Sequence, residues 1–248
     1  MLVQEARLRV AESLVPSRKI KFLDFGCGSG EFAKRLSTHG HTGVGIDPAP
    51  RLIEAARIAA PDIEFRVGSL DNWPDGKFDV IFALSVLFFL DESDEELFFK
   101  KSLASLEEGG IIICSYINKF ADYASLNEYT VKFYREEIIG KFDGLPIPDL
   151  EDLFPNSKGD KSFKNVSIHN RTIIRTSNPF NIERRFRSVG FDLDELVFSR
   201  FYFLPPDIVE REENIDLFKK QIEITENLDN LDLGPVFGKT MTCRVRPA

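Results

Sequence analysis

The chain has 248 residues, of which 43% are hydrophobic and 29% charged, with a formal net charge of −8 and a pI near 5.1. This length and apolar content suit one sizeable domain with room for an insertion. The acidic balance argues against an exposed polyanion such as nucleic acid as a partner. The longest apolar run, Val80 to Leu90, is too short to cross a bilayer. We therefore expect neither nucleic-acid binding nor membrane insertion.

The cysteines and the first residues bear on cellular location. The three cysteines are widely spaced, at Cys27, Cys114 and Cys243, without a paired metal-ligand spacing. They predict reduced thiols in a cytoplasmic protein and no metal site. The segment from Leu2 to Leu14 predicts an amphipathic helix, with charges too early for a signal peptide. We expect this helix to cover one edge of a sheet.

Residues 20–30, Ile-Lys-Phe-Leu-Asp-Phe-Gly-Cys-Gly-Ser-Gly, combine a strand pattern with a glycine turn. Apolar residues precede Gly26, and helical spacing begins at Glu31, so the predicted order is strand, turn, helix. Glycines allow a positive φ and leave room for a ligand near the backbone. The first amides of the following helix point to the space above the strand. This arrangement predicts a nucleotide-like ligand.

Details of the turn distinguish between the possible nucleotides. The dinucleotide fingerprint needs a small residue where Glu31 stands, and a phosphate-binding Gly-Lys-Ser/Thr loop is absent. The remaining pattern, Asp-Phe-Gly-Cys-Gly-Ser-Gly, resembles the first motif of the class I S-adenosylmethionine-dependent methyltransferases. Their cofactor carries an amino group, a carboxylate and a sulfonium but no phosphate, which suits this turn. The predicted cofactor contacts here are Asp24, Gly26, Cys27, Gly28 and Gly30, with Cys27 as a small filler rather than a nucleophile.

A second acid ends the next predicted strand, His41 to Asp47. Its distance from the glycine turn fits one strand-helix-strand crossover. Asp47 should therefore lie beside the turn, at the carboxyl end of the neighbouring parallel strand. A carboxylate at that place can accept hydrogen bonds from both hydroxyls of a ribose. Pro48 follows at the start of the next helix and is included among the cofactor contacts.

The third predicted strand, Asp62 to Val67, is followed by the turn from Gly68 to Asp71. The family resemblance implies a Gly-Asp pair at this turn, with its acid on the adenine amino group. Ser69 replaces that acid here, so the hydrogen bond could come from Ser69 or from Asp71. Leu70 is expected to form the wall against the base.

The fourth predicted strand, Lys77 to Ser85, is apolar enough to be buried on both faces. Ala83 and Ser85 fall at its end, where the resemblance implies the floor beneath the methionine part of the cofactor. Phe88-Phe89-Leu90 stands where many relatives have a histidine, which removes one candidate base. The Asn-Pro-Pro-Tyr type motif of base-modifying relatives is also absent after this strand.

The rest of the chain completes an α/β framework. The resemblance implies a Rossmann-like open seven-stranded sheet, mostly parallel with an antiparallel last strand, with helices on both faces. The cofactor-binding domain is predicted over residues 1–116 and 178–248. Residues 117–177 break the alternation and are rich in Tyr, Phe, Asn and Pro. They predict a lid that forms the acceptor site, since an insertion here leaves from the ligand edge; a peripheral packing subdomain is the alternative.

The resemblance implies S-adenosyl-L-methionine as cofactor and a small-molecule acceptor, such as a sugar, a lipid head group or a secondary metabolite. Methyl transfer from a sulfonium is an in-line displacement, to which positioning contributes most. A base is useful only for a hydroxyl or a protonated amine acceptor. His169 in the insertion and Tyr116 after the fifth strand are the candidate catalytic residues, for either O- or N-methylation.

Two other functions fit a similar sheet. One is a non-catalytic subunit that binds the cofactor, which an occluded or missing acceptor pocket would favour. The other is a dinucleotide-dependent oxidoreductase, against which Glu31 and the lack of a Tyr-x-x-x-Lys pair speak. The sequence does not predict the oligomeric state.

Overall fold

A computed structural model of the chain describes residues 2–121, 130, 133, 175–201, 216, 219, 235 and 238–248. The chain divides into two compact units. The first comprises Met1–Ile117, Arg175–Val197 and Thr240–Ala248, and the second Asn118–Ile174 and Phe198–Lys239. Most of the insertion predicted over 117–177, with His169, lies outside the described residues. The domain boundaries and the lid therefore stay predictions.

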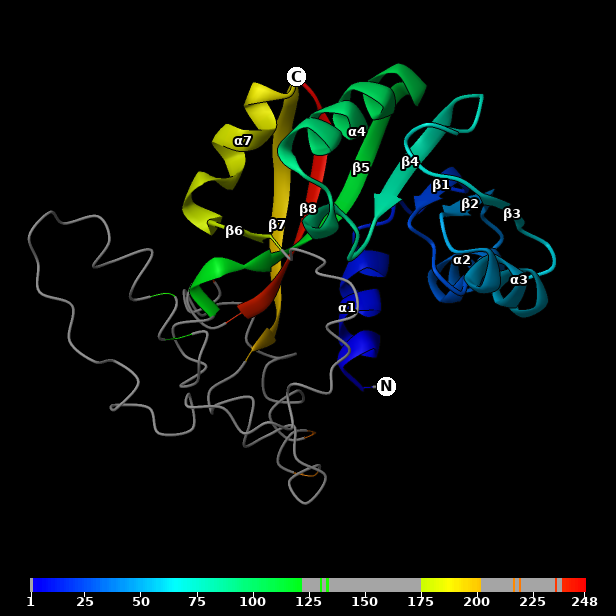
Figure 1. Ribbon diagram of the computed structural model, residues 1–248, viewed down its shortest axis with the longest axis horizontal. Helices are drawn as coiled ribbons and strands as arrows, with labels where there is room; N and C mark the ends of the chain where they lie inside the picture. The colour runs from blue at the N-terminus through cyan, green and yellow to red at the C-terminus, as the bar shows by residue number, and fades with distance from the viewer. Residues whose placement is uncertain are drawn as a thin grey trace, which may run out of the picture. The chain divides into compact units, whose positions relative to one another are not determined.

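One mixed sheet organises the described part of the chain (Figure 1). Its strand order is β3-β2-β1-β4-β5-β8-β7, and the short β6 pairs with β5. The β1, β2, β3, β4 and β5 neighbours pair in parallel, whereas β8 runs antiparallel to β5. The strands are β1 Lys21–Phe25, β2 Thr42–Asp47, β3 Glu64–Val67, β4 Phe78–Ala83, β5 Leu106–Asn118, β6 Thr176–Ser177, β7 Phe191–Phe201 and β8 Gly238–Pro247. The predicted Rossmann-like sheet with an antiparallel last strand is confirmed, with β6 as an additional two-residue strand.

The helices cover both faces of the sheet, as predicted. They are α1 Leu2–Ser13, α2 Glu31–Thr38, α3 Pro50–Ala59, α4 Glu92–Ser105 and α7 Ile182–Ser188, with 3₁₀ turns η1 Leu87–Phe89 and η7 Pro179–Asn181. The helices α1, α2 and α3 share one apolar core with β1 and β4. On the other face α4 packs against α7, with the rings of Phe99 and Phe186 5.8 Å apart. Among the described residues no helix combines the length and apolar character that a membrane span requires.

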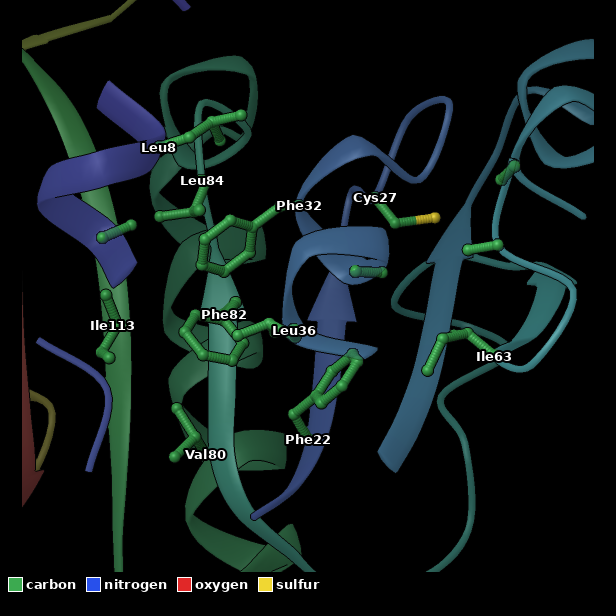
Figure 2. Close-up of a cluster of buried hydrophobic side chains, with 14 of the residues drawn as sticks. Leu8, Phe22, Cys27, Phe32, Leu36, Ile63, Val80, Phe82, Leu84 and Ile113 are labelled. Carbon is green, nitrogen blue, oxygen red and sulfur yellow. The ribbon is translucent and has the colours of Figure 1, made fainter. Parts of the chain in front are cut away.

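The position of α1 differs from the prediction. Instead of covering an edge, it lies against a face of the sheet, because its buried side chains Leu8, Ala11 and Leu14 join the core of the central strands. Figure 2 shows Leu8 beside Leu84, which follows β4. An edge position would have left this apolar stripe half exposed, whereas the face buries it almost completely.

Aromatic rings fill the core below the glycine turn. Phe82 of β4 is fully buried, with its ring centroid 6.1 Å from that of Phe22 and 4.9 Å from that of Phe32, both in edge-to-face geometry (Figure 2). Phe22 precedes the turn and Phe32 opens α2 after it. This packing therefore fixes both arms of the turn against the central strand.

We expect Phe82→Ala to lower the free energy of unfolding by about 3–5 kcal/mol, because it opens a cavity among rings that cannot collapse into it. Chemical denaturation measures the loss. Leu103→Ala is the matched control, since Leu103 is 45% exposed, and should change the same quantity by less than about 0.5 kcal/mol. Equal effects of the two substitutions would contradict the role of this aromatic core.

Candidate functional site

The strand register brings the predicted site residues to one edge of the sheet. Phe25 is paired with Ile46, Asp47 with Val67, and Asp24 with Phe82, so the carboxyl ends of β1, β2, β3 and β4 are level. The strand order reverses between β1 and β4, which flank the turn. In open α/β sheets, ligands bind outside the carboxyl ends at this reversal.

The three glycines of the turn have different physical roles. All have positive φ angles, 75° at Gly26, 55° at Gly28 and 76° at Gly30. A Cβ on Gly26 would lie 2.7 Å from Cγ2 of Val86, and one on Gly30 2.9 Å from Cβ of Ala56. A Cβ on Gly28 would meet nothing within 4 Å. Packing therefore requires the first and third glycines, while the second leaves open space where a ligand can approach the backbone.

Asp47 holds the turn to the end of β2. The residue is 9% exposed, and its carboxylate accepts hydrogen bonds from the amide of Gly28 at 3.0 Å and the amide of Ala49 at 2.9 Å. The amides of Gly26 and Cys27 donate to the carbonyl oxygen of Ile46 at 2.8 and 3.0 Å. Each carboxylate oxygen keeps a second lone pair beyond the bond to its amide. The geometry places Asp47 beside the turn as predicted, and leaves acceptor capacity for a ligand hydroxyl.

Asp24 and Arg7 bring opposite charges to the same edge. Asp24 is 3% exposed, and its pKa is raised to about 7, first by burial and then by the nearby Asp47 carboxylate, while Arg7 acts to lower it. The Arg7 guanidinium reaches across from α1 and donates to the Ser85 hydroxyl. The sequence analysis missed Arg7, which lies 19 positions before Gly26 on a separate helix. Its one available signal was a charged residue next to the apolar stripe of that helix.

Ser85 lies two residues after the central strand β4 and has an unusual backbone conformation. Its φ is 59°, and it is the one residue other than glycine with a positive φ in the part of the chain that the structure describes. Its amide donates to the Ser115 hydroxyl at 2.8 Å. Such strain clusters at functional sites because the surroundings must hold it. Ala83, the last residue of β4, is fully buried, and its predicted contact with the cofactor stays a prediction.

In the turn after β3, a side chain is hydrogen-bonded to a backbone amide of the same turn. The Ser69 hydroxyl accepts a 3.3 Å hydrogen bond from the Asp71 amide, and Leu70 is 7% exposed. Trp73 donates from Nε1 to the Ser105 hydroxyl at 2.9 Å, and its ring lies 5.5 Å from that of Phe25. The contact of adenine with Ser69 or Asp71 stays a prediction.

The remaining predicted contacts differ in exposure. Cys27 is buried in the turn, and burial, with help from Asp24 and Asp47, raises the pKa of its thiol. A protonated thiol is a poor nucleophile, in keeping with a filler role. Pro48 is exposed at the end of β2.

Tyr116, a predicted catalytic residue, faces the opposite side of the sheet from α1. It is 2% exposed, and its hydroxyl donates to Glu95 of α4 at 2.7 Å. The buried Glu95 carboxylate also accepts from Arg175 at 2.9 Å and from Arg185, whose guanidinium lies 5.7 Å from the Tyr116 ring centroid. Burial above all raises the pKa of the Tyr116 hydroxyl well above its usual value. These contacts support a structural role for Tyr116 rather than the catalytic one; His169 lies outside the described residues.

The site and fold define the class of protein. Residues 23–114 match a family model described as a methyltransferase domain. They carry the glycine turn, the acid at Asp47 and the central strand, all with the topology described above. Over this region the chain carries a methyltransferase domain.

The chain is similar in sequence to individual curated proteins. The chain is 32% identical over 136 residues to a ubiquinone biosynthesis O-methyltransferase of Azorhizobium caulinodans, covering 52% of this chain and 49% of that protein. It is 29% identical over 170 residues to the protein of the same name from Pelagibacter ubique, covering 66% and 67%. The chain thus spans about half the length of the first of these curated relatives.

Solved structures agree on the fold. An S-adenosylmethionine-dependent methyltransferase from Mesorhizobium loti aligns with a TM-score of 0.58 at 15% identity, covering 98% of this chain and 99% of that one. A magnesium protoporphyrin IX methyltransferase from Synechocystis PCC 6803, with bound S-adenosylhomocysteine, aligns with a TM-score of 0.57 at 12% identity, covering 99% and 85%. At these identities the likeness concerns the backbone architecture.

The glycine turn yields a paired stability prediction. Gly28→Ala should lower the free energy of unfolding by about 1–2 kcal/mol, because a residue with a Cβ is strained in the left-handed conformation. Gly26→Ala should cost about 1–3 kcal/mol more, because its Cβ also collides with Val86. Urea denaturation of both variants measures the difference, and equal losses would contradict the packing role assigned to Gly26.

Asp24 yields a pH-dependent prediction. Because its folded pKa of about 7 exceeds the ordinary value of 3.8, the folded state binds more protons than the unfolded state between these values. Its contribution to stability therefore falls as pH rises through this window. We expect Asp24→Asn to raise the free energy of unfolding at pH 8, by up to about 4 kcal/mol, and the gain to shrink toward pH 4. Denaturation at both pH values tests this; a gain independent of pH would contradict it.

Proposed function

We propose that this protein transfers a methyl group from S-adenosyl-L-methionine to a hydroxyl group of a small-molecule acceptor. The observation that carries the proposal is the Asp47 carboxylate, bonded to the Gly28 amide at the level carboxyl ends of β1 and β2. Each Asp47 oxygen has a second lone pair that could accept a hydrogen bond from a ribose hydroxyl. The names of the curated relatives, which are O-methyltransferases, favour oxygen over nitrogen as the methylated atom.

The charges at the site complement the amino-acid part of the cofactor. That part carries an ammonium and a carboxylate, and the sulfonium beside it adds a positive charge. Asp24 offers an anion and Arg7 a cation at the end of the central strands. We assign the ammonium to Asp24 and the carboxylate to Arg7, with the nucleoside between Asp47 and Leu70. Ligand binding would then ionise Asp24 fully, since an adjacent cation lowers the pKa of a carboxyl group.

Catalysis would rest mainly on positioning. The methyl carbon is already activated by the sulfonium, so the protein must hold the acceptor oxygen in line with it and exclude water. A hydroxyl acceptor also benefits from a base that removes its proton. His169 is the proposed base, because the Tyr116 hydroxyl is already donated to Glu95. The insertion over 117–177 is proposed to build the acceptor site.

The acceptor is proposed to be a sugar, a lipid head group or a hydroxylated secondary metabolite. The net charge of −8 favours such a molecule over nucleic acid. The free thiols Cys27, Cys114 and Cys243, all buried, support a cytoplasmic location, where thiols stay reduced.

The test has two parts, cofactor binding and transfer. Isothermal titration with S-adenosylhomocysteine should give saturable binding at one site. Cofactor carrying a labelled methyl group should then label at least one member of a panel of sugars, phenols, lipid head groups and amines. Absence of S-adenosylhomocysteine binding, or tight binding of a pyridine dinucleotide instead, would refute the proposal. Binding without transfer to any member would favour a non-catalytic subunit.

We expect Asp47→Ala to weaken S-adenosylhomocysteine binding at least about tenfold, since it removes charged hydrogen bonds. Asp79→Ala is the matched control. Asp79 also accepts a backbone amide, that of Lys21 at 2.7 Å, but at the opposite ends of β1 and β4. The control should keep the wild-type affinity, and an Asp47 variant that also keeps it would refute the ribose assignment.

A further inference from the structure

We infer that Arg35 is a positioning residue for the cofactor: it holds the first turns of α1 against the glycine-turn unit, and thereby keeps Arg7 at Ser85. The inference rests on the proposed function and adds to it a residue that need not touch the ligand. It assigns a functional purpose to the ion pairs between α1 and α2.

Arg35 joins two carboxylates of α1. Its guanidinium contacts Glu5, and Nη1 lies 3.7 Å from Oε2 of Glu12. Glu5 and Glu12 are seven positions apart, two helical turns, so they lie on one side of α1. The hydrogen bond with Arg35 is the largest cause that lowers the pKa of Glu5, and the same bond raises the pKa of Arg35. Glu12 is also contacted by His39, whose Nδ1 lies 3.3 Å from Oε1 of Glu12.

Arg7 lies between the ionic and apolar attachments of α1. The buried apolar side chains of the described part of this helix begin at Leu8 and continue at Ala11 and Leu14. They anchor the helix on the C-terminal side of Arg7. Glu5, with its tie to Arg35, lies on the N-terminal side. Without this tie, the contacts of the described side chains would hold the turn that carries Arg7 from its C-terminal side alone, and a helix end so held frays.

The other end of the tie is part of the cofactor turn itself. Arg35 lies on α2, which begins directly after Gly30 and is fixed by the buried side chains of Phe32, Ala33 and Leu36. The distance between Arg35 and the turn is therefore constant. Through Glu5, this rigid helix sets where Arg7 meets Ser85, at the end of β4.

This placement makes the effect of Arg35 selective for one part of the ligand. Arg7 is assigned to the carboxylate of the amino-acid part, whereas Asp47 and Leu70 are assigned to the nucleoside. Loss of the contact between Arg35 and Glu5 should therefore weaken the binding of ligands that carry the carboxylate, and leave the binding of ligands without it unchanged. A merely structural role would weaken both alike.

The experiment compares two ligands on Arg35→Gln. Isothermal titration should give a Kd for S-adenosylhomocysteine raised about three- to tenfold, a modest effect because the ion pairs are partly exposed. The Kd for 5′-methylthioadenosine, which lacks the amino-acid part, should stay within about twofold of wild type. Arg9→Gln is the matched control: Arg9 also contacts Glu5, at 3.1 Å, but from within α1, so both affinities should be retained.

A double-mutant cycle with Arg7→Gln completes the test. If Arg35 acts through Arg7, then Arg35→Gln should cause no further loss of S-adenosylhomocysteine affinity in the Arg7→Gln background. Additive losses, equal losses for both ligands, or an unchanged affinity in the single variant would each overturn the inference. Failure of the wild-type protein to bind S-adenosylhomocysteine would instead overturn the proposed function.

Discussion

The hydrogen bonds between the Asp47 carboxylate and the amides of Gly28 and Ala49 are the contact on which the site depends. They join the glycine turn of one βα unit to the start of the next. Such charge-assisted bonds are stronger than those between neutral groups, because the acceptor carries a full charge. They also satisfy two backbone donors near the end of the sheet. The acid therefore shapes the turn even before a ligand arrives.

This arrangement has an electrostatic cost. Asp47 lies close enough to disfavour the charge on Asp24, which is almost fully buried. The fold relieves part of this cost with Arg7 of α1, whose charge lowers the pKa of Asp24. A cationic ligand would relieve more of it. The charge distribution that costs the fold stability is therefore the one that would favour a positively charged ligand.

Much of the fold could be predicted from the sequence, because the information was local. Strand and helix periodicities, the glycines of the turn and the acid ending β2 all lie within short segments. Arg7 could not be found this way, since its place depends on how α1 packs over the sheet. The hydrophobic stripe of α1 predicted burial but not which surface of the sheet buries it. The predicted position of α1 at an edge of the sheet was wrong. Tyr116 was expected after the fifth strand but lies within β5; its partner Glu95 is on a helix 21 positions earlier, and no local pattern reveals that pairing. The roles of the site residues, including His169, stay predictions.

The Glu95 cluster has a consequence for how sequences of this kind can vary. One buried carboxylate receives two guanidinium groups, those of Arg175 and Arg185. Loss of either arginine leaves the acid neutralised by the other, while loss of the acid leaves two like charges facing each other at the edge of the core. The cluster is therefore redundant in its cations and not in its anion. We therefore expect the fold to tolerate a single replacement of either arginine more readily than a single replacement of the glutamate.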